Sequence, residues 1–236
     1  MKKLLILALS IITFTFCLGA SKLYVGTNAE YPPFEYLEND TIVGLDADII
    51  EELTKRMGVE YKWSNMSFDG LIPALQMNKL DIVIAGMSVT PQRAKAVNFS
   101  VPYLSSEVVF VGRKNNPINS MDELVGKTFG VEIGTTKEAS AKKIKDSIVV
   151  PFNGNTPALI ALKSGKVDAM VVDKSVGDNY ITNNEDLMII GTLAGEPKAI
   201  AVGKKYPELL KNVNVALTSM LEDGTISNLK EKYGVK

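Results

Sequence analysis

The sequence of 236 residues contains no histidine and a single cysteine, Cys17. Catalysis by Ser-His or Cys-His pairs and zinc bound by histidine are therefore excluded, and one cysteine cannot form an internal disulfide. Any chemistry would need carboxylates, lysines, hydroxyls or a borrowed cofactor. We expect no bound cofactor and no metal.

The sequence also lacks an excess of either charge. It has 26 lysines and arginines against 27 aspartates and glutamates, a formal charge of −1. No basic face or charged tail is predicted, so we expect no nucleic-acid partner. With 46% hydrophobic residues the chain can bury a substantial core, either as one large domain or as two lobes of about 100 residues each.

The N-terminus has the pattern of a secretory signal. Two lysines precede an apolar stretch over residues 4–16, which is too short for a comfortable membrane span, and small residues follow at 19–21. We predict a signal peptide over residues 1–20 and a periplasmic or otherwise extracytoplasmic protein. Lipidation of Cys17 is the alternative, although Phe16 is bulkier than such cleavage sites usually have.

Apolar strand patterns alternate with amphipathic helix patterns, which predicts an α/β fold. Residues 46–58 have apolar side chains at helical spacing and end in Gly58. Residues 80–86, LDIVIAG, form a continuous apolar run typical of a strand buried on both faces of a parallel sheet. Further strands are expected at 22–27, 42–44, 59–63, 108–112, 127–134 and 148–152, and further helices from 67, at 135–144, from 156, at 207–221 and at 225–233.

Polar residues mark where three helices should begin. Thr90 and Pro91 predict an N-cap followed by proline at the first helical position, and Thr156 with Pro157 predicts a second helix start. The sequence SMDE at 120–123 predicts a capping box. Because a strand ends just before Thr90, free N–H groups and the positive end of the helix dipole should meet there and attract an anion.

One sequence pattern occurs twice. Residues 74–86, ALQMNKLDIVIAG, and 161–173, ALKSGKVDAMVVD, share Ala-Leu, a lysine, an aspartate and a following apolar run in the same frame. Each predicts a helix end, a turn and a buried strand, which suggests two similar lobes. Ligands of such sheets bind beyond the C-terminal strand ends, so a cleft would have Arg93 on one wall and Asp173 on the other.

Arg93 and Asp173 suit the two poles of an α-amino acid. A guanidinium binds a carboxylate with two parallel hydrogen bonds, and Ser88 lies close enough in sequence to assist. Asp173 follows a buried run and would pair with an ammonium. The alternatives are a surface arginine and an aspartate that caps the next helix.

Aromatic residues in loops could enclose the side chain of the ligand. Tyr31 and Phe34 flank two prolines, and Phe68 precedes a predicted helix. For Phe34 we expect a place in the core instead.

Taken together, these segments resemble the periplasmic amino-acid-binding proteins of ABC transporters, extracellular solute-binding family 3. The similar segments follow the order of the family along the whole chain after the leader. They are YPPFEY (31–36), VGLDADI (43–49), FDGLIPAL (68–75), KLDIVIAGMSVTPQR (79–93), NFSVPY (98–103), GTT (134–136), KVDAMVVD (166–173) and EDGT (222–225).

The resemblance implies a two-lobed periplasmic-binding-protein fold of type II, in which each lobe is a sheet flanked by helices and two strands form a hinge. Lobe 1 would comprise residues 22–109 plus 199–236, and lobe 2 residues 110–198. The protein would be a monomer that closes around a free L-amino acid and delivers it to an ABC permease in the membrane.

The resemblance also assigns roles to individual residues. Arg93 would hold the α-carboxylate with Ser88 and the Thr136 backbone, and Asp173 with the Gly86 carbonyl would hold the α-ammonium. Tyr31 and Phe68 would stack on the ligand side chain, and Asn28, Ala85 and Glu132 would lie near its far end.

Two positions bear on the choice of ligand. Relatives that bind basic amino acids often have an acid where this chain has Asn28, so this position weakens the case for a basic ligand. A glutamine-binding relative has lysine where this chain has Glu132, so the second position favours a side chain rich in hydrogen-bond donors. An anion at the far end disfavours glutamate and aspartate, because a buried unpaired like charge is costly. The expected ligand is arginine or lysine, followed by glutamine.

The main alternative is an enzyme similar to arogenate or prephenate dehydratases, in which Asp173, Glu132 and Lys137 would do acid-base work. No residue set specifically requires such catalysis, and we expect a protein without enzymatic activity. On the binding interpretation Lys137 is a bystander, and replacing it with alanine should leave ligand binding unchanged.

Overall fold

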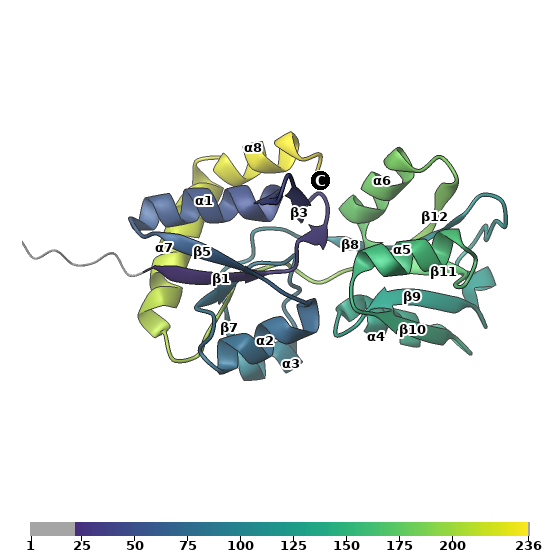
Figure 1. Cartoon of the computed structure of the whole chain (residues 1–236), viewed down its shortest axis with the longest axis horizontal. Coiled ribbons are helices and arrows are strands. Elements are labelled where there is room, and N and C mark those ends of the chain that lie inside the picture. The colour runs from purple at the N-terminus through teal and green to yellow at the C-terminus, as the bar shows by residue number, and fades with distance from the viewer. Residues whose placement is uncertain (1–21, 236) are drawn as a thin grey trace, which may run out of the picture.

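The structure, a computed structural model, describes residues 22–235. Two five-stranded sheets form two lobes placed side by side (Figure 1). The predicted signal peptide and Cys17 lie outside the described residues.

The first lobe is built on the sheet β5-β1-β6-β13-β7. Strand β1 runs parallel to its neighbours β5 and β6, and β13 runs antiparallel to β6 and β7. Helices α1 and α8 lie on one side of the sheet and α2 and α3 on the other (Figure 1). The elements are β1 (Leu23–Thr27), β5 (Tyr61–Asn65), β6 (Ile82–Val83), β7 (Asn98–Phe99), β13 (Ala201–Val202), α1 (Leu45–Met57), α2 (Phe68–Gln76), α3 (Pro91–Ala96), α7 (Pro207–Glu222) and α8 (Thr225–Lys232), with a small sheet of β2 (Glu30–Tyr31), β3 (Glu35–Glu38) and β4 (Thr41–Val43).

The second lobe is built on the sheet β10-β9-β11-β8-β12. Strands β9, β10 and β11 run parallel, whereas β8 is antiparallel to both of its neighbours. The elements are β8 (Glu107–Arg113), a 3-10 helix (Asp122–Leu124), β9 (Thr128–Glu132), α4 (Thr136–Lys142), β10 (Ile148–Phe152), α5 (Asn155–Lys163), β11 (Ala169–Asp173), α6 (Lys174–Asn183) and β12 (Leu187–Ala194).

The chain crosses between the lobes before β8 and after β12. The two crossing segments meet at Lys198, which forms isolated β-bridges with Leu104 and with Ser88. This arrangement confirms the predicted α/β fold of two lobes with a two-strand hinge. The division at residues 109/110 and 198/199 stays a prediction, and β8 belongs to the second sheet from Glu107 onward.

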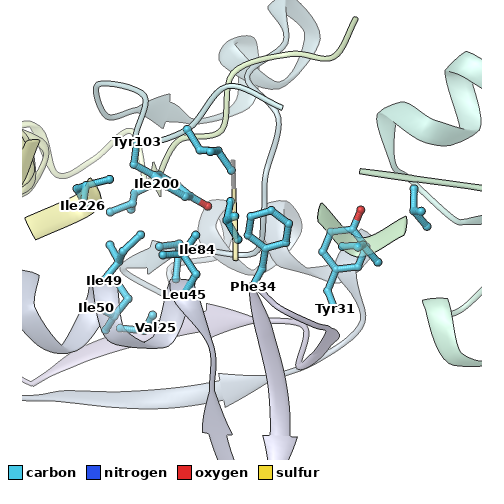
Figure 2. Packing of buried hydrophobic residues seen from close by; sticks show 14 of the residues in the cluster. Val25, Tyr31, Phe34, Leu45, Ile49, Ile50, Ile84, Tyr103, Ile200 and Ile226 are labelled. Carbon is cyan, nitrogen blue, oxygen red and sulfur yellow. The ribbon is translucent and has the colours of Figure 1, made fainter. Parts of the chain in front are cut away.

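The core of the first lobe forms where α1 packs on the sheet. Ile49, Ile50 and Leu53 lie on one helix face and are fully buried, and each such side chain stabilises the fold by about 1.5–3 kcal/mol. Figure 2 shows Phe34 within this cluster and Tyr31 at its edge, on the side of the second lobe. Phe34 is fully buried, which confirms the expectation that it belongs to the core.

The repeated sequence pattern folds in the same way in both lobes. Asp81 accepts a hydrogen bond from the backbone N–H of Tyr24 in β1 at 2.8 Å, and Asp168 accepts one from Thr128 in β9 at 2.9 Å. After each turn a lysine N–H returns to the alanine that opens the pattern, at 2.9 Å in both units. Each aspartate thereby ties its strand to the start of the neighbouring parallel strand.

The capping box predicted at residues 120–123 does not form. Asp122 begins a 3-10 helix with Met121 at its N-cap and no side-chain capping bond. The carboxylate of Glu123 instead accepts the N–H of Asn119 at 3.1 Å, so it closes a loop rather than a helix start.

Two other element boundaries differ from prediction. Within the apolar run 80–86 only Ile82 and Val83 join the ladder, because Gly86 has φ +50 and turns the chain out of the sheet. Helix α5 begins at Asn155 with Gly154 as its cap, earlier than Thr156, and the Asn155 side chain is bonded to Glu132.

Candidate functional site

Arg93 lies between the lobes because the start of α3 is fixed as predicted. Thr90 Oγ1 accepts the Arg93 N–H at 3.1 Å, and Pro91 occupies the first helical position. The guanidinium then donates to the backbone oxygen of Ser88 at 2.8 Å and to that of Gly134, from the other lobe, at 3.0 Å. No other hydrogen bond of the guanidinium is found within residues 22–235, which leaves further N–H groups for a carboxylate.

Arg93 stays positively charged in its surroundings. Its guanidinium carbon lies 5.1 Å from the centre of the Phe68 ring. Burial lowers the pKa of Arg93, while Glu196 and Asp173 raise it, and a guanidinium with such a high ordinary pKa stays charged. The alternative of an ordinary surface arginine does not fit, because the side chain bonds to both lobes.

A crevice of about 600 Å³ opens beside this guanidinium, between α3 and α4. Arg93 and Thr136 line it together with Gln92, Ser140 and Glu196. Behind them, the hydroxyls of Ser88 and Thr136 lie 3.3 Å apart across the two lobes. The crevice therefore reaches the predicted carboxylate end of the site and stops short of Asp173.

Asp173 ends β11 and is fully buried. It occupies the N-cap position of α6, but its side chain makes no capping bond. The carboxylate instead accepts the Tyr31 hydroxyl at 2.8 Å and the Ser106 hydroxyl at 3.1 Å. It also forms ion pairs with Lys137 and, at 2.8 Å, with Lys198.

The two lysines keep Asp173 ionised. Burial by itself raises the pKa of Asp173, but the positive charges of Lys137 and Lys198 outweigh it and hold that pKa far below its ordinary value. Burial lowers the pKa of Lys198 to about 8, against the attraction of Asp173. Lys198 also donates to Ser88 Oγ at 2.9 Å, so it links the two predicted poles of the site.

Sequence reasoning missed Lys198 and treated Lys137 as a bystander. Signals for both were present. Lys137 lies in the first turn of α4, where a cation opposes the positive end of the helix dipole, and Lys198 precedes the buried run of residues 199–202. A buried lysine needs an anionic partner, and Asp173 meets that need for both.

Tyr31 and Gly86 shape the space next to Asp173. The Tyr31 hydroxyl also accepts the Asp173 N–H at 3.0 Å, and the ring stacks on Phe34 with centroids 5.7 Å apart. Gly86 has left-handed φ and donates its N–H to Asp46 at 2.8 Å. A side chain at Gly86 would press on the Tyr31 ring at 3.4 Å, so glycine suits this position for both reasons.

The predicted far end of the site contains Glu132 at the end of β9. Its Oε2 accepts a hydrogen bond from Asn155 at 2.8 Å, whereas the buried Oε1 has no hydrogen-bond partner among the described residues. Burial raises the pKa of Glu132 to about 7, and the nearby carboxylates of Glu30 and Asp69 add to the shift. A cation at this position would satisfy the free oxygen.

Asn28 and Ala85 are both buried. The Asn28 amide donates to the Met66 backbone oxygen at 3.0 Å, which fixes its orientation. The roles of these two residues toward a ligand remain predictions.

Residues 23–236 match the family model of the bacterial extracellular solute-binding proteins, family 3. The chain belongs to this family. It is 35% identical over 221 residues to the arginine-binding extracellular protein ArtP of Bacillus subtilis, covering 91% of this chain and 87% of that protein. It is also 35% identical over 215 residues to a probable histidine-binding protein of Campylobacter jejuni, covering 89% and 84%.

Solved structures show the same fold. An ancestral arginine-binding protein bound to arginine superposes with a TM-score of 0.86 at 42% sequence identity, covering 90% of this chain and 97% of that one. Over residues 22–235, no helix is both long and apolar enough to cross a bilayer, and no three side chains of the metal-binding types cluster together.

Proposed function

We propose that this protein is the extracytoplasmic binding component of an ABC importer for a basic L-amino acid, arginine or lysine ahead of glutamine. The α-carboxylate would bind the free N–H groups of Arg93 with Ser88 and the Thr136 backbone. Asp173 and the Gly86 carbonyl would receive the α-ammonium, and Tyr31 and Phe68 would enclose the aliphatic part.

The observation that favours a basic side chain is the state of Glu132. Its Oε1 is buried without a hydrogen-bond partner among the described residues, and the charges of Glu30 and Asp69 act on the same carboxyl group against that of Lys137. An unsatisfied buried acceptor costs about 1–3 kcal/mol, which a guanidinium or ammonium donor would recover. The ligands named for the relatives above agree with this chemistry.

The proposed mechanism is closure of the lobes around the ligand. Arg93 belongs to the first lobe, and Asp173 and Glu132 belong to the second, so one amino acid can contact both sides only when the lobes are together. Contacts made only in the closed form shift the population toward it, and the permease would recognise that form.

A thermal-shift screen tests this proposal. The mature chain is heated with each of the twenty amino acids, ornithine and citrulline, and a bound ligand raises the unfolding temperature by mass action. We expect arginine or lysine to give the largest shift and aspartate and glutamate to give none. A largest shift with glutamate would overturn the choice of a basic ligand, and no shift with any compound would overturn amino-acid binding.

The dehydratase interpretation receives no support from the relatives named above, which are all described as binding proteins. Incubation with arogenate or prephenate checks it directly, and we expect no turnover.

A further inference from the structure

The proposed ammonium site on Asp173 is already filled by the protein itself. Oδ1 accepts from Ser106 and pairs with Lys198, while Oδ2 accepts the Tyr31 hydroxyl and pairs with Lys137. Lys198 also reaches Oδ2 at 3.0 Å. Oδ2 therefore has three donors and Oδ1 has two, so a further ammonium could reach the carboxylate only by displacing one of them.

Lys198 is a fixed part of this arrangement. Its backbone N–H donates to Leu104 at 2.8 Å and its carbonyl accepts from Tyr103 at 3.0 Å, so the crossing segment holds it from both sides. Its ammonium has a second partner in Ser88 Oγ. Replacing Lys198 would remove the bonds of its ammonium to Asp173 and Ser88 and disturb the hinge, and we therefore regard Lys198 as structural.

Lys137 is held differently. Its ammonium pairs with Asp173 Oδ2 and lies 5.4 Å from the centre of the Tyr31 ring, and within the described chain this is its one ion pair. An amino acid with its carboxylate on Arg93 would direct its own α-ammonium to the same carboxylate beside the same ring. Lys137 and Lys198 already bring two positive charges to Oδ2, and a third cation there would be repelled by both, so the ligand ammonium could bind only in place of Lys137.

We infer that Lys137 determines specificity by competing with the α-ammonium of the ligand for Asp173. The inference rests on the proposed function, since it takes the carboxylate to be on Arg93 and a cationic side chain to be at Glu132. Its consequence is that the α-amine adds little to affinity. A carboxylic acid with the same cationic end and no α-amine would bind about as well as the amino acid.

Two ligands that differ only in this amine test the inference. Calorimetry compares L-arginine with 5-guanidinopentanoic acid, which is arginine without its α-amine, on the wild type and on Lys137→Ser. In the wild type we expect the two dissociation constants to agree within about threefold. In Lys137→Ser the freed carboxylate should bind the α-ammonium, so arginine should gain about tenfold or more while the analogue stays the same.

Two further variants complete the comparison. Lys163→Ser removes an exposed lysine of the same lobe that pairs with Asp186 at 3.6 Å, and it should retain the wild-type ratio. Lys137→Arg keeps the cation and should also retain that ratio. Because each ratio is measured within one variant, partial unfolding cannot produce the expected change.

A wild type that prefers arginine by more than about tenfold would overturn the inference, as would a ratio that Lys137→Ser leaves unchanged. Either result leaves the proposed function standing, because arginine binds in both. If neither compound binds to any variant and lysine and glutamine do not bind either, the proposed function itself fails.

Discussion

The two ends of the proposed ligand site are held in different ways. At one end Arg93 donates to two backbone carbonyls, borders a crevice and keeps free N–H groups. At the other end Asp173 is fully buried, and lysines, a tyrosine and a serine satisfy its carboxylate. Both ends connect the lobes, Arg93 through Gly134 and Asp173 through Tyr31, and on the proposed function the Arg93 end would serve mainly affinity.

The largest effect is expected at the buried end. Asp173→Asn leaves Lys137 and Lys198 without their anion, and breaking a buried ion pair costs about 3–5 kcal/mol of unfolding free energy. Urea denaturation at pH 7 measures the loss. A change below about 1 kcal/mol would contradict the structural role.

The same carboxylate predicts an acid dependence of stability. Because the folded-state pKa of Asp173 is lowered, its contribution is present above the unfolded value of about 3.9 and is lost as pH falls through the folded value. The difference in stability between the wild type and Asp173→Asn should therefore shrink below about pH 4. A difference that grows with acid would contradict this sign.

At the open end the effect should fall on affinity. Arg93→Ala should weaken arginine binding by at least about 100-fold, because the ligand carboxylate loses its charged partner. The unfolding free energy should fall by only about 1–2 kcal/mol, because one lost hydrogen bond is to the buried Ser88 and the other to the exposed Gly134. Lys95→Ala, which removes an exposed lysine of the same helix, is the matched control and should bind as the wild type does.

Glu132 predicts a smaller effect that depends on pH. Burial raises its pKa to about 7, and a cationic side chain binds the ionised form, so arginine affinity should rise with pH through that value. Glu132→Gln should weaken arginine binding about tenfold at pH 8 and remove this dependence. Glutamine, with its neutral side chain, is the control ligand, and an equal rise for glutamine in the wild type would contradict the assignment.

Ionisation of Glu132 should lower the free energy of unfolding, whereas ionisation of Asp173 raises it. Its folded-state pKa is raised above the unfolded value of about 4.3, so its charge destabilises the fold progressively from there to about pH 7. Glu132→Gln should consequently gain stability relative to the wild type as pH rises through that window. Denaturation midpoints at pH 5 and pH 8 measure the difference.

The smallest effects concern the unit that both lobes repeat. Asp81→Asn and Asp168→Asn each weaken one bond between a carboxylate and the start of a neighbouring strand, and each should cost about 1 kcal/mol. The two costs should agree, because the geometry is the same in both lobes. Denaturant titration measures the free energy of unfolding of both variants. Two losses that differ by more than about 1 kcal/mol would contradict the equivalence of the two units.

Much of the fold could be predicted from the sequence. Periodicity and helix signals located α1 with its Gly58 end, and Thr90 with Pro91 located the start of α3. The repeated pattern predicted a helix end, a turn and a strand in each lobe, although β6 ends at Val83 and β11 continues to Asp173. These features depend on the backbone preferences of neighbouring residues, so a short segment of sequence is enough to predict them.

The contacts within the site were harder to predict from the sequence. Lys198 lies 25 residues from Asp173, and its partner becomes apparent only when the crossing segment is placed against β11. The SMDE segment failed as a capping box because Glu123 found a different local donor. The first outcome depends on partners far apart in sequence and the second on competition between nearby donors, and spacing along the chain determines neither.

A crystal structure of the protein grown with L-arginine tests the central claim most directly. We predict the ligand carboxylate on the guanidinium of Arg93 and the ligand guanidinium on Oε1 of Glu132, with the lobes closed around both. Density for arginine in the opposite orientation, or bound outside the junction of the lobes, would contradict the account.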